Sequence, residues 1–293
     1  MHRALHPVPI DTCPLPDVPP PGAVAEALDV TYATMDGQPQ RLDLAWPKTS
    51  GNHALIVIIH GGGWSAGTKD LYRKEVRRLA SIGYAAATID YRLANVARNI
   101  WPAPMQDVRC AVRWLRAHAG EYAVDQRRVV AVGASAGGQL AAMLGVAADG
   151  PGFDSDECPV NDQPVAVSAV VSYYGAYDLR TPSTTFGGMM VPAIAQLFGG
   201  DETTVTARSA LASPITHVDA SDPPFLLLHA PDDPIIPIAS ARAFDTELRQ
   251  AGVSSLLVEV DDAKPAHGFP LLVTTRPRVT CTTLAFLRAA VGD

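Results

Sequence analysis

A serine between two glycines is the first feature of the chain that points to chemistry. Residues 129–144, VVAVGASAGGQLAAML, pass from β-branched residues into an alanine-rich helical pattern, with Ser135 between Gly133 and Gly137. A G-x-S-x-G sequence at a strand-to-helix junction forms a sharp turn that exposes the serine oxygen, because small residues let strand and helix approach closely. A plain turn of small residues is the alternative. We predict that Ser135 is a nucleophile.

A glycine-rich segment earlier in the chain supplies a matching element. Residues 60–64, HGGGW, follow a short apolar run. Acyl transfer places negative charge on the former carbonyl oxygen, and backbone N–H groups that no side chain obstructs stabilise it best. A phosphate-binding loop is the alternative, but its Lys-Ser/Thr pair and the G-x-G-x-x-G spacing are missing. We predict an oxyanion hole formed by the N–H groups of Gly62, Gly63 and Ala136. His60 is expected to brace the loop by hydrogen bonding.

Two aspartates and one histidine complete this set. A serine hydroxyl needs a general base, and the base needs a group that orients it. Asp232 and Asp233 follow the apolar run 224–230, and His267 follows the run 255–260. The ends of parallel strands collect catalytic groups, and the chain order Ser, Asp, His is that of one known class of hydrolase. The alternatives are aspartates that cap a turn and a histidine on the surface. We predict His267 as the base.

Short apolar runs and helical patterns alternate along the chain, and they define the elements that must position these residues. The apolar runs, which are typical of strands buried on both faces, span residues 54–59, 84–90, 128–133, 167–175, 224–230 and 255–260. Helical periodicity appears in residues 71–82, 105–115, 139–147, 239–251 and 279–290. This alternation predicts an α/β fold with a mostly parallel, doubly wound sheet and helices on both faces. Residues 27–33 and 40–47 predict an antiparallel pair at the sheet edge.

The chain divides into an arm and one domain. Residues 1–28 are rich in proline and predict an extended arm, and residues 29–293 predict a single domain. Residues 178–213 fit no strand or helix of the sheet, and we interpret them as a substrate-pocket or cap insertion. The candidates to line that pocket are Trp64, Met189 and Met190. Packing of these side chains in the core is the alternative.

Composition narrows the classes of partner. The 293 residues are 47% hydrophobic and 18% charged, and the net charge is −7 with no block of basic residues, which argues against a nucleic-acid partner. No apolar stretch approaches the roughly 20 residues that a membrane span needs. The N-terminal segment lacks the apolar core of a secretory signal. We therefore expect a cytoplasmic protein, or a secreted or periplasmic one whose signal peptide is absent from this sequence. A homodimer is compatible with these data.

Cysteine usage gives a further expectation. The four cysteines are widely spaced, without a C-x-x-C pair, so no metal site is expected. Free cysteines are often found in protein interiors, and we expect these residues to be mostly buried thiols.

In their order along the chain, these motifs resemble the α/β-hydrolase fold esterases of the hormone-sensitive-lipase type. Within that group, the resemblance is to the BD-FAE branch, which includes feruloyl and acetyl-xylan esterases. It is carried by HGGGWSAGTKD, IDYRLA, VGASAGGQLAAML, SYYGAYDL, SPITHV, PPFLLLHAPDDPIIP and AHGF, and runs from about Asp29 to the C-terminus. The family pattern H-G-x-x-D-x-x-V-P aligns with His229 and Pro237, which places the catalytic acid on Asp233. The substitutions Ala230 and Ile236 within that pattern remove no polar group.

The resemblance implies a serine carboxylesterase. Its expected substrates are short- to medium-chain or aryl carboxylic esters, hydrolysed through an acyl-enzyme without a metal or an organic cofactor. An arylformamidase-type amidase is the alternative enzyme, because that family shares the H-G-G loop and the triad. A ligand-binding receptor on a hydrolase scaffold is the alternative from another class. Such receptors have lost the catalytic histidine, whereas His267 is present here.

Overall fold

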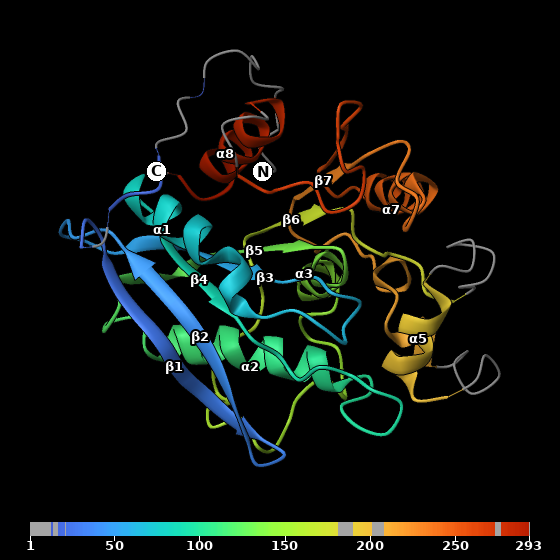
Figure 1. Cartoon of the computed structure of the whole chain (residues 1–293), viewed down its shortest axis with the longest axis horizontal. Helices are drawn as coiled ribbons and strands as arrows, with labels where there is room; N and C mark the ends of the chain where they lie inside the picture. The colour runs from blue at the N-terminus through green and yellow to red at the C-terminus, as the bar shows by residue number, and fades with distance from the viewer. Residues whose placement is uncertain are drawn as a thin grey trace.

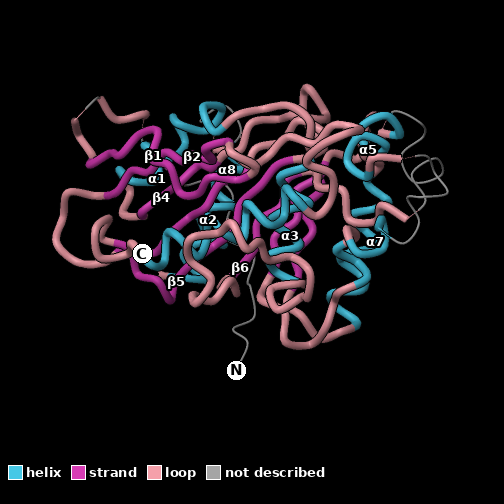
Figure 2. The backbone as a smooth tube through the Cα atoms, turned by 90° about the horizontal axis from the view of Figure 1, so that it is seen from below, coloured by secondary structure: helices cyan, strands magenta, loops and turns pink. Residues whose placement is uncertain are grey.

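A single twisted sheet organises the part of the chain that the computed structural model describes. The described residues are 13, 17–20, 22–180, 190–200, 208–272 and 277–292. Within these ranges, eight strands are hydrogen-bonded in the order β1-β2-β4-β3-β5-β6-β7-β8. In Figures 1 and 2, β1 and β2 lie at one end of the molecule, and α5 and α7 lie at the other.

The edge of the sheet is a hairpin. Strands β1 (Ala25–Met35) and β2 (Gln38–Trp46) pair antiparallel, and β2 pairs antiparallel with β4 (Ala85–Ile89). The predicted antiparallel edge pair is therefore confirmed. Strand β1 begins at Ala25, so the first strand starts inside the expected arm 1–28.

The other strands run parallel to β4. They are β3 (His53–Ile59), β5 (Val124–Ala134), β6 (Ala169–Tyr173), β7 (Phe225–His229) and β8 (Ser255–Glu259). Every residue of β4, β6 and β7 is buried, because alternate side chains point to opposite faces and both faces are covered. These continuous apolar runs confirm the predicted parallel sheet.

Helices cover both faces and enclose two separate cores. They are α1 (Arg73–Ser81), α2 (Ala103–Ala117), α3 (Ala136–Val146), α5 (Val191–Phe198), α7 (Ile238–Gln250) and α8 (Pro277–Val291). Side chains of α1 and α8 pack in one core with Ile56 and Ile58 of β3. Those of α2, α3 and α7 pack in the other with Leu55 and Val57. The α/β-hydrolase fold is thereby shown, with its sheet wound on both faces.

Helix α5 lies in the segment 178–213, for which the sequence predicted no helix. A proline stands in its first turn, and Gly199 at its end has φ 66°, a left-handed conformation that glycine adopts easily. The side chains of Ile194, Leu197 and Phe198 are buried. This part of the segment therefore packs onto the domain as a short amphipathic helix.

One cysteine expectation is wrong. Cys110 of α2 and Cys158, which are 48 positions apart in the sequence, form a disulfide with Cα atoms 5.7 Å apart. Ion pairs from Arg109 and Arg113 to Asp154 hold the loop that carries Cys158 against α2. Spacing along the sequence could not reveal this pairing, because it depends on how that loop folds back.

The described helices include no candidate for a membrane span. None of them is both long enough and apolar enough to cross a bilayer.

Candidate active site

Ser135 stands at the sharp turn between β5 and α3. Its backbone has φ 55° and ψ −120°, an uncommon conformation for a residue with a side chain. The two flanking glycines are required by contact, because a Cβ at Gly133 would lie 2.0 Å from the carbonyl oxygen of Gly137. A Cβ at Gly137 would lie 2.2 Å from that of Ile59. The turn is tight enough to hold the serine in this strained conformation.

His267 connects Ser135 to a carboxylate. Its Nε2 lies 3.0 Å from the Ser135 Oγ, and its Nδ1 lies 2.8 Å from Oδ2 of Asp233. The ring of Tyr174 packs against the imidazole, with the two ring centres 4.7 Å apart. These contacts favour the tautomer in which Nδ1–H donates to Asp233 and Nε2 accepts from the serine hydroxyl. Ser135 is 132 positions from His267 in the sequence, and Asp233 is 34 positions from it, yet the three side chains form one hydrogen-bonded chain.

The carboxylate of Asp233 is buried and held on both oxygens. Oδ1 accepts the N–H groups of Ile235 and Ile236, at 2.8 and 2.9 Å. Burial raises the pKa of Asp233, but hydrogen bonds from His229, His267 and the Ile236 N–H outweigh burial and hold it well below its ordinary value. Asp233 is therefore ionised at neutral pH. The neighbouring Asp232 is exposed, so the structure brings Asp233 and not Asp232 to His267.

A second histidine, His229, contacts the same carboxylate, and the sequence did not predict this contact. It ends β7, is fully buried, and places Nε2 2.7 Å from the Ile236 carbonyl oxygen and 3.3 Å from Oδ2 of Asp233. Its Nδ1 has no hydrogen-bond partner among the described residues. We therefore assign the ring proton to Nε2, which donates to the Ile236 carbonyl oxygen in the turn that carries Asp233. The signal for this contact was present in the family pattern, in which this histidine precedes the acid by four positions.

The glycine-rich loop after β3 faces Ser135. Gly62 and Gly63 have φ 116° and 58°, and a Cβ at Gly62 would lie 2.1 Å from the Ala66 carbonyl oxygen. Glycine is thus needed at Gly62 for space as well as for conformation. Ala136 opens α3, where first-turn N–H groups have no acceptor within the helix. The three predicted oxyanion donors lie on the two segments that flank the Ser135 side chain.

His60 lies beneath this loop. It is fully buried, its ring stacks on Tyr91 with centres 4.3 Å apart, and its Nδ1 lies 2.7 Å from the Gly61 carbonyl oxygen. Burial lowers its pKa, so the ring is neutral and Nδ1–H donates to Gly61. This contact is of the kind expected for a residue that braces the loop.

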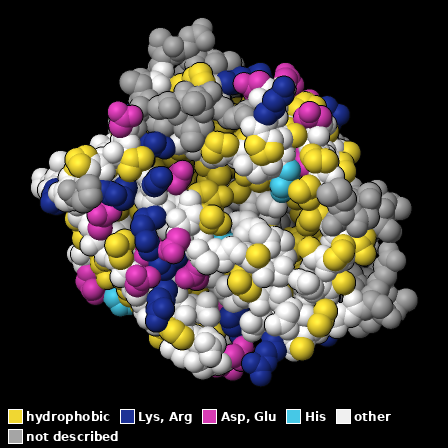
Figure 3. All heavy atoms as spheres, in the orientation of Figure 1, with side chains coloured by type: hydrophobic (Ala, Val, Ile, Leu, Met, Phe, Trp, Pro, Cys, Tyr) yellow, Lys and Arg dark blue, Asp and Glu magenta, His cyan; other side chains and the backbone are white. Residues whose placement is uncertain are grey.

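A cavity of about 520 Å³ opens over Ser135. Besides Ser135 and His267, it is lined by glycines and mainly apolar side chains: Gly61, Gly62, Gly63, Gly67, Leu71, Tyr72, Ala134, Tyr174, Met190, Ile235 and Gly268. Figure 3 shows a hollow near the middle of this face, with hydrophobic side chains around it and a histidine at its rim. The site is therefore an apolar pocket with a few polar groups at one end, as small-molecule sites commonly are.

The three candidates for the pocket wall have different outcomes. Met190 lines the cavity. Met189 lies outside the described residues. Trp64 is fully buried and its indole N–H donates to the Gln139 side chain at 2.9 Å, so the expectation that it lines the pocket is wrong. Its indole packs in the core beneath the loop, and the N–H group, the only polar group of the indole, is hydrogen-bonded to Gln139.

No metal centre is present among the described residues, since they contain no group of three or more His, Cys, Asp or Glu side chains placed to hold an ion. The groups that the site itself offers are the serine, the histidine, the aspartate and backbone N–H groups. This set suits nucleophilic acyl transfer.

Comparisons with known proteins agree with this geometry. The chain is 30% identical over 269 residues to the probable carboxylic ester hydrolase LipM of Mycobacterium tuberculosis, covering 90% of the chain and 61% of LipM. It is 31% identical over 292 residues to the esterase LipQ of the same organism, covering 95% of the chain and 66% of LipQ. The chain thus spans about three fifths to two thirds of the length of these relatives.

Solved structures of similar fold include esterase 2 of Thermogutta terrifontis phosphonylated by cyclosarin, with 25% identity, a TM-score of 0.69, and coverage of 91% of this chain and 92% of that one. A truncated carbohydrate esterase from gut microbiota has a TM-score of 0.73 at 23% identity, covering 92% of this chain and 99% of that one, which shows the shared fold. The BD-FAE family model matches residues 42–248, more than half of the 293 residues. The chain therefore belongs to the BD-FAE family.

Proposed function

We propose that this chain is a serine carboxylesterase that hydrolyses short- to medium-chain or aryl carboxylic esters. One observation carries the proposal: His267 lies 3.0 Å from the Ser135 oxygen through Nε2 and 2.8 Å from Asp233 through Nδ1. A base within hydrogen-bonding distance of a nucleophile, and itself oriented by a carboxylate, is the arrangement that activates a serine. The esterase names of the relatives support the same activity.

In the proposed mechanism, the Ser135 oxygen attacks the ester carbonyl while Nε2 of His267 takes its proton. Asp233 holds the ring in the correct tautomer and stabilises the imidazolium that forms. The N–H groups of Gly62, Gly63 and Ala136 stabilise the oxyanion, and each such donor contributes about 3–4 kcal/mol in comparable enzymes. The imidazolium then protonates the departing alkoxide. Water attacks the acyl-enzyme by the same route and releases the acid.

The apolar cavity supports an acyl group of limited size. Its volume is about 520 Å³, and its lining includes Leu71, Met190 and Ile235. A short alkyl chain or one aromatic ring would bury its apolar surface there at about 25 cal/mol per Å². Such groups are the acyl portions that we propose.

Two measurements test this function. Ser135→Ala should abolish turnover of p-nitrophenyl esters while leaving the circular dichroism spectrum and the melting temperature nearly unchanged. A variant that kept full esterase activity would contradict the proposal. A rate series over acetyl, butyryl and feruloyl esters and N-formylkynurenine should favour the esters, and a preference for N-formylkynurenine would support an amidase in their place.

We infer that the chain works in an oxidising compartment outside the cytoplasm. The Cys110–Cys158 disulfide supports this inference, because structural disulfides persist in secreted and periplasmic proteins and are rare in reducing cytosol. Peptide mapping of the alkylated, unreduced protein from its native cells should recover the two cysteine peptides as one linked species. Recovery of both peptides fully alkylated would contradict the inference.

A further inference from the structure

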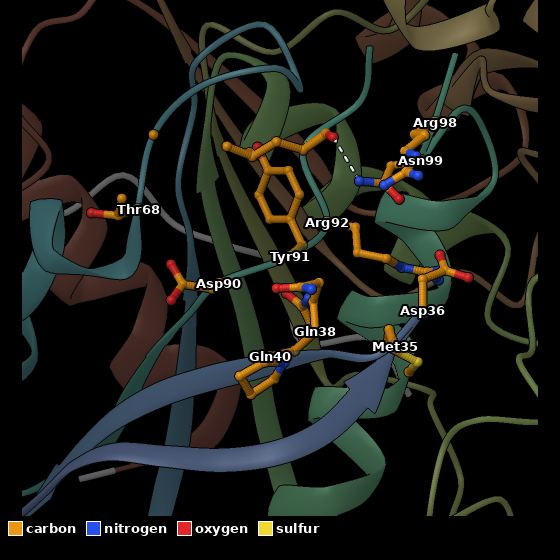
Figure 4. A pocket seen from close by; sticks show the side chains of 13 residues that line it. Met35, Asp36, Gln38, Gln40, Thr68, Asp90, Tyr91, Arg92, Arg98 and Asn99 are labelled. Carbon is orange, nitrogen blue, oxygen red and sulfur yellow. Dashed lines mark hydrogen bonds and ion pairs between the residues drawn. The ribbon is translucent and has the colours of Figure 1, made fainter. Parts of the chain in front are cut away.

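A second cavity borders the glycine-rich loop. It has a volume of about 870 Å³ and lies between the tip of the β1–β2 hairpin and residues 90–99, which follow β4. Gly67 lines both this cavity and the one over Ser135, so the end of the loop separates the two. Amides and charges form much of the lining: Asp36, Gln38, Gln40, Arg92, Arg98 and Asn99. In Figure 4, Asp90 and Thr68 lie across the cavity from these last two residues.

The residues that follow β4 hold the loop, residues 60–69, at both of its ends. At the start, the Tyr91 hydroxyl donates to the His60 carbonyl oxygen at 3.0 Å. At the end, Oδ1 of Asp90 accepts the backbone N–H of Lys69 at 2.8 Å. A single dipeptide, Asp90–Tyr91, therefore contacts the loop where it leaves β3 and again where it enters the next turn.

Asp90 is itself firmly placed. Its N–H donates to the Arg41 carbonyl oxygen at 2.8 Å, and its carbonyl oxygen accepts the Tyr32 hydroxyl at 2.7 Å. A short 3₁₀ helix, Lys69–Tyr72, begins at the residue that Asp90 holds, and Thr68 before it makes no side-chain cap hydrogen bond. The first N–H groups of a helix have no acceptor within it. The Asp90 carboxylate thus caps this turn from the neighbouring strand.

The end of the loop packs directly on the segment of the predicted oxyanion hole. The Ala66 N–H donates to the Gly62 carbonyl oxygen at 3.0 Å. A Cβ at Gly67 would lie only 2.5 Å from the Gly61 carbonyl oxygen. At such close approach the two halves of the loop cannot move independently. Because Lys69 is two residues from Gly67, a shift of its backbone is passed on to Gly61 and Gly62.

We propose that Asp90 is a positioning residue of the oxyanion hole. Its carboxylate fixes the end of the loop, and the packing within the loop fixes the N–H groups of Gly62 and Gly63. The proposal rests on the esterase function proposed above. Asp90 does not line the cavity over Ser135, so it acts on the loop and not on the substrate. Its loss should weaken stabilisation of the transition state and leave binding of the uncharged ester nearly unchanged.

Two variants of Asp90 separate its acceptor oxygen from its volume. Asp90→Leu removes the acceptor at similar volume, and kcat for p-nitrophenyl acetate should fall by about tenfold to a hundredfold, the range expected when catalytic groups are misplaced by up to about 1 Å. KM should stay within about threefold. Asp90→Asn keeps an acceptor oxygen and should retain most of the rate. Asp162→Leu makes the first change at an exposed position and should alter neither constant. Equal losses for Asp90→Leu and Asp90→Asn would overturn the acceptor role.

A pair of ketones gives a readout that belongs to the oxyanion hole. The Ser135 oxygen adds to the carbonyl carbon of an alkyl trifluoromethyl ketone, its proton passes to His267, and the carbonyl electron pair becomes an oxyanion. The methyl ketone of the same chain binds without this addition. Asp90→Leu should raise the inhibition constant of the trifluoromethyl ketone by about the factor by which kcat falls, and that of the methyl ketone by less than twofold. An equal rise for both ketones would overturn the proposal.

Folding and the esterase function are checked separately. If circular dichroism shows that Asp90→Leu does not fold, Asp90→Ala, which adds no apolar bulk beside the cavity, should show the same split between the two ketones. Unchanged kcat in the folded variants would overturn the role of Asp90 alone. Failure of the wild-type enzyme on p-nitrophenyl acetate would instead contradict the esterase function, so the two failures are distinguishable.

Discussion

The two adjoining cavities differ in what their walls are made of. The cavity over Ser135 is lined by glycine backbone and apolar side chains, whereas the cavity beyond Gly67 is lined by side-chain amides and charges. In the first, polar groups are few and fixed by the fold, which suits charge that develops in a transition state in a site of low dielectric constant. In the second, they are numerous and partly unpaired, which suits binding of a polar group. The two cavities thus present different chemical groups at one edge of the sheet.

Rigidity is achieved differently in the two places. Around Ser135, close backbone approach fixes the geometry, as the 2.2 Å clash of a Cβ at Gly137 with Ile59 shows. At the polar cavity, Arg92 is clamped between Asp36 and Asp107 and holds the wall in place. Changes at the catalytic centre should therefore affect all esters alike, and changes in the apolar wall should affect the choice of acyl group.

The largest loss of ester turnover is expected for Asp233→Asn. The variant removes the charge that orients His267, and turnover of every ester should fall by about 10⁴, as for loss of the equivalent carboxylate in other serine hydrolases. Steady-state rates with acetyl and butyryl esters and with glycerol esters measure this. Rates that fell for one substrate class only would contradict a catalytic centre common to all these esters.

The pH dependence of stability gives a second test of the same carboxylate. Its pKa is lowered in the folded protein, so its stabilising contribution is present above the unfolded value of about 3.9 and is lost as pH falls through the lower folded value. Urea unfolding of wild type and Asp233→Asn should show a difference in the free energy of unfolding that shrinks as pH falls below about 4. A difference that stays constant from pH 7 to pH 3 would contradict the lowered pKa.

A smaller effect is expected for His229→Leu. The imidazole donates to the turn that holds Asp233, so its loss should lower kcat by about 10-fold to 100-fold, as for other groups that orient a catalytic residue through hydrogen bonds, with KM nearly unchanged. His229→Gln, which keeps an N–H donor, should restore part of the rate. Equal rates for the Leu and Gln variants would show that the imidazole serves packing alone.

Substitution of Gly137 should affect stability in preference to substrate choice. Gly137→Ala forces a side chain against backbone atoms of β3 and should lower the free energy of unfolding by about 2 kcal/mol or more. Gly120→Ala is the matched control, because nothing lies within 4 Å of a Cβ there. Thermal melts of both variants measure the contrast, and equal melting temperatures would contradict the packing of the turn.

The smallest effect is expected in the apolar wall. Met190→Ala should enlarge the cavity and shift preference toward longer acyl chains by about threefold to tenfold, since one or two methylenes are involved. Acetyl ester rates, and the ratio of glycerol to ethyl esters, should stay within twofold. A change in that ratio would show that Met190 also contacts the alcohol portion of the ester.

Much of the fold follows from local sequence patterns. Continuous apolar runs such as residues 54–59 predict buried strands, and β3 spans His53–Ile59. The structure places Ser135, Asp233 and His267 within hydrogen-bonding distance, as their order along the chain and the family pattern predict. These features are predictable because each depends on residues close together in sequence or on a fixed strand order.

The features that escaped prediction depend on contacts between distant segments. The Cys110–Cys158 pairing requires a loop to fold back onto α2, and the burial of Trp64 requires Gln139 as a partner beneath the loop. The polar cavity is formed by residues from three separate segments, within 35–40, 67–68 and 90–99. Its residues could be brought together only by the three-dimensional fold.

Covalent labelling of the nucleophile tests the central claim most directly. The protein is incubated with diethyl p-nitrophenyl phosphate, an organophosphate that reacts with activated serines, and the adduct is mapped by mass spectrometry while esterase activity is followed. We predict one diethylphosphoryl group per chain, on Ser135, with loss of activity in proportion to labelling and no labelling of His267→Ala. An adduct on another residue, or full activity after Ser135 is modified, would contradict it.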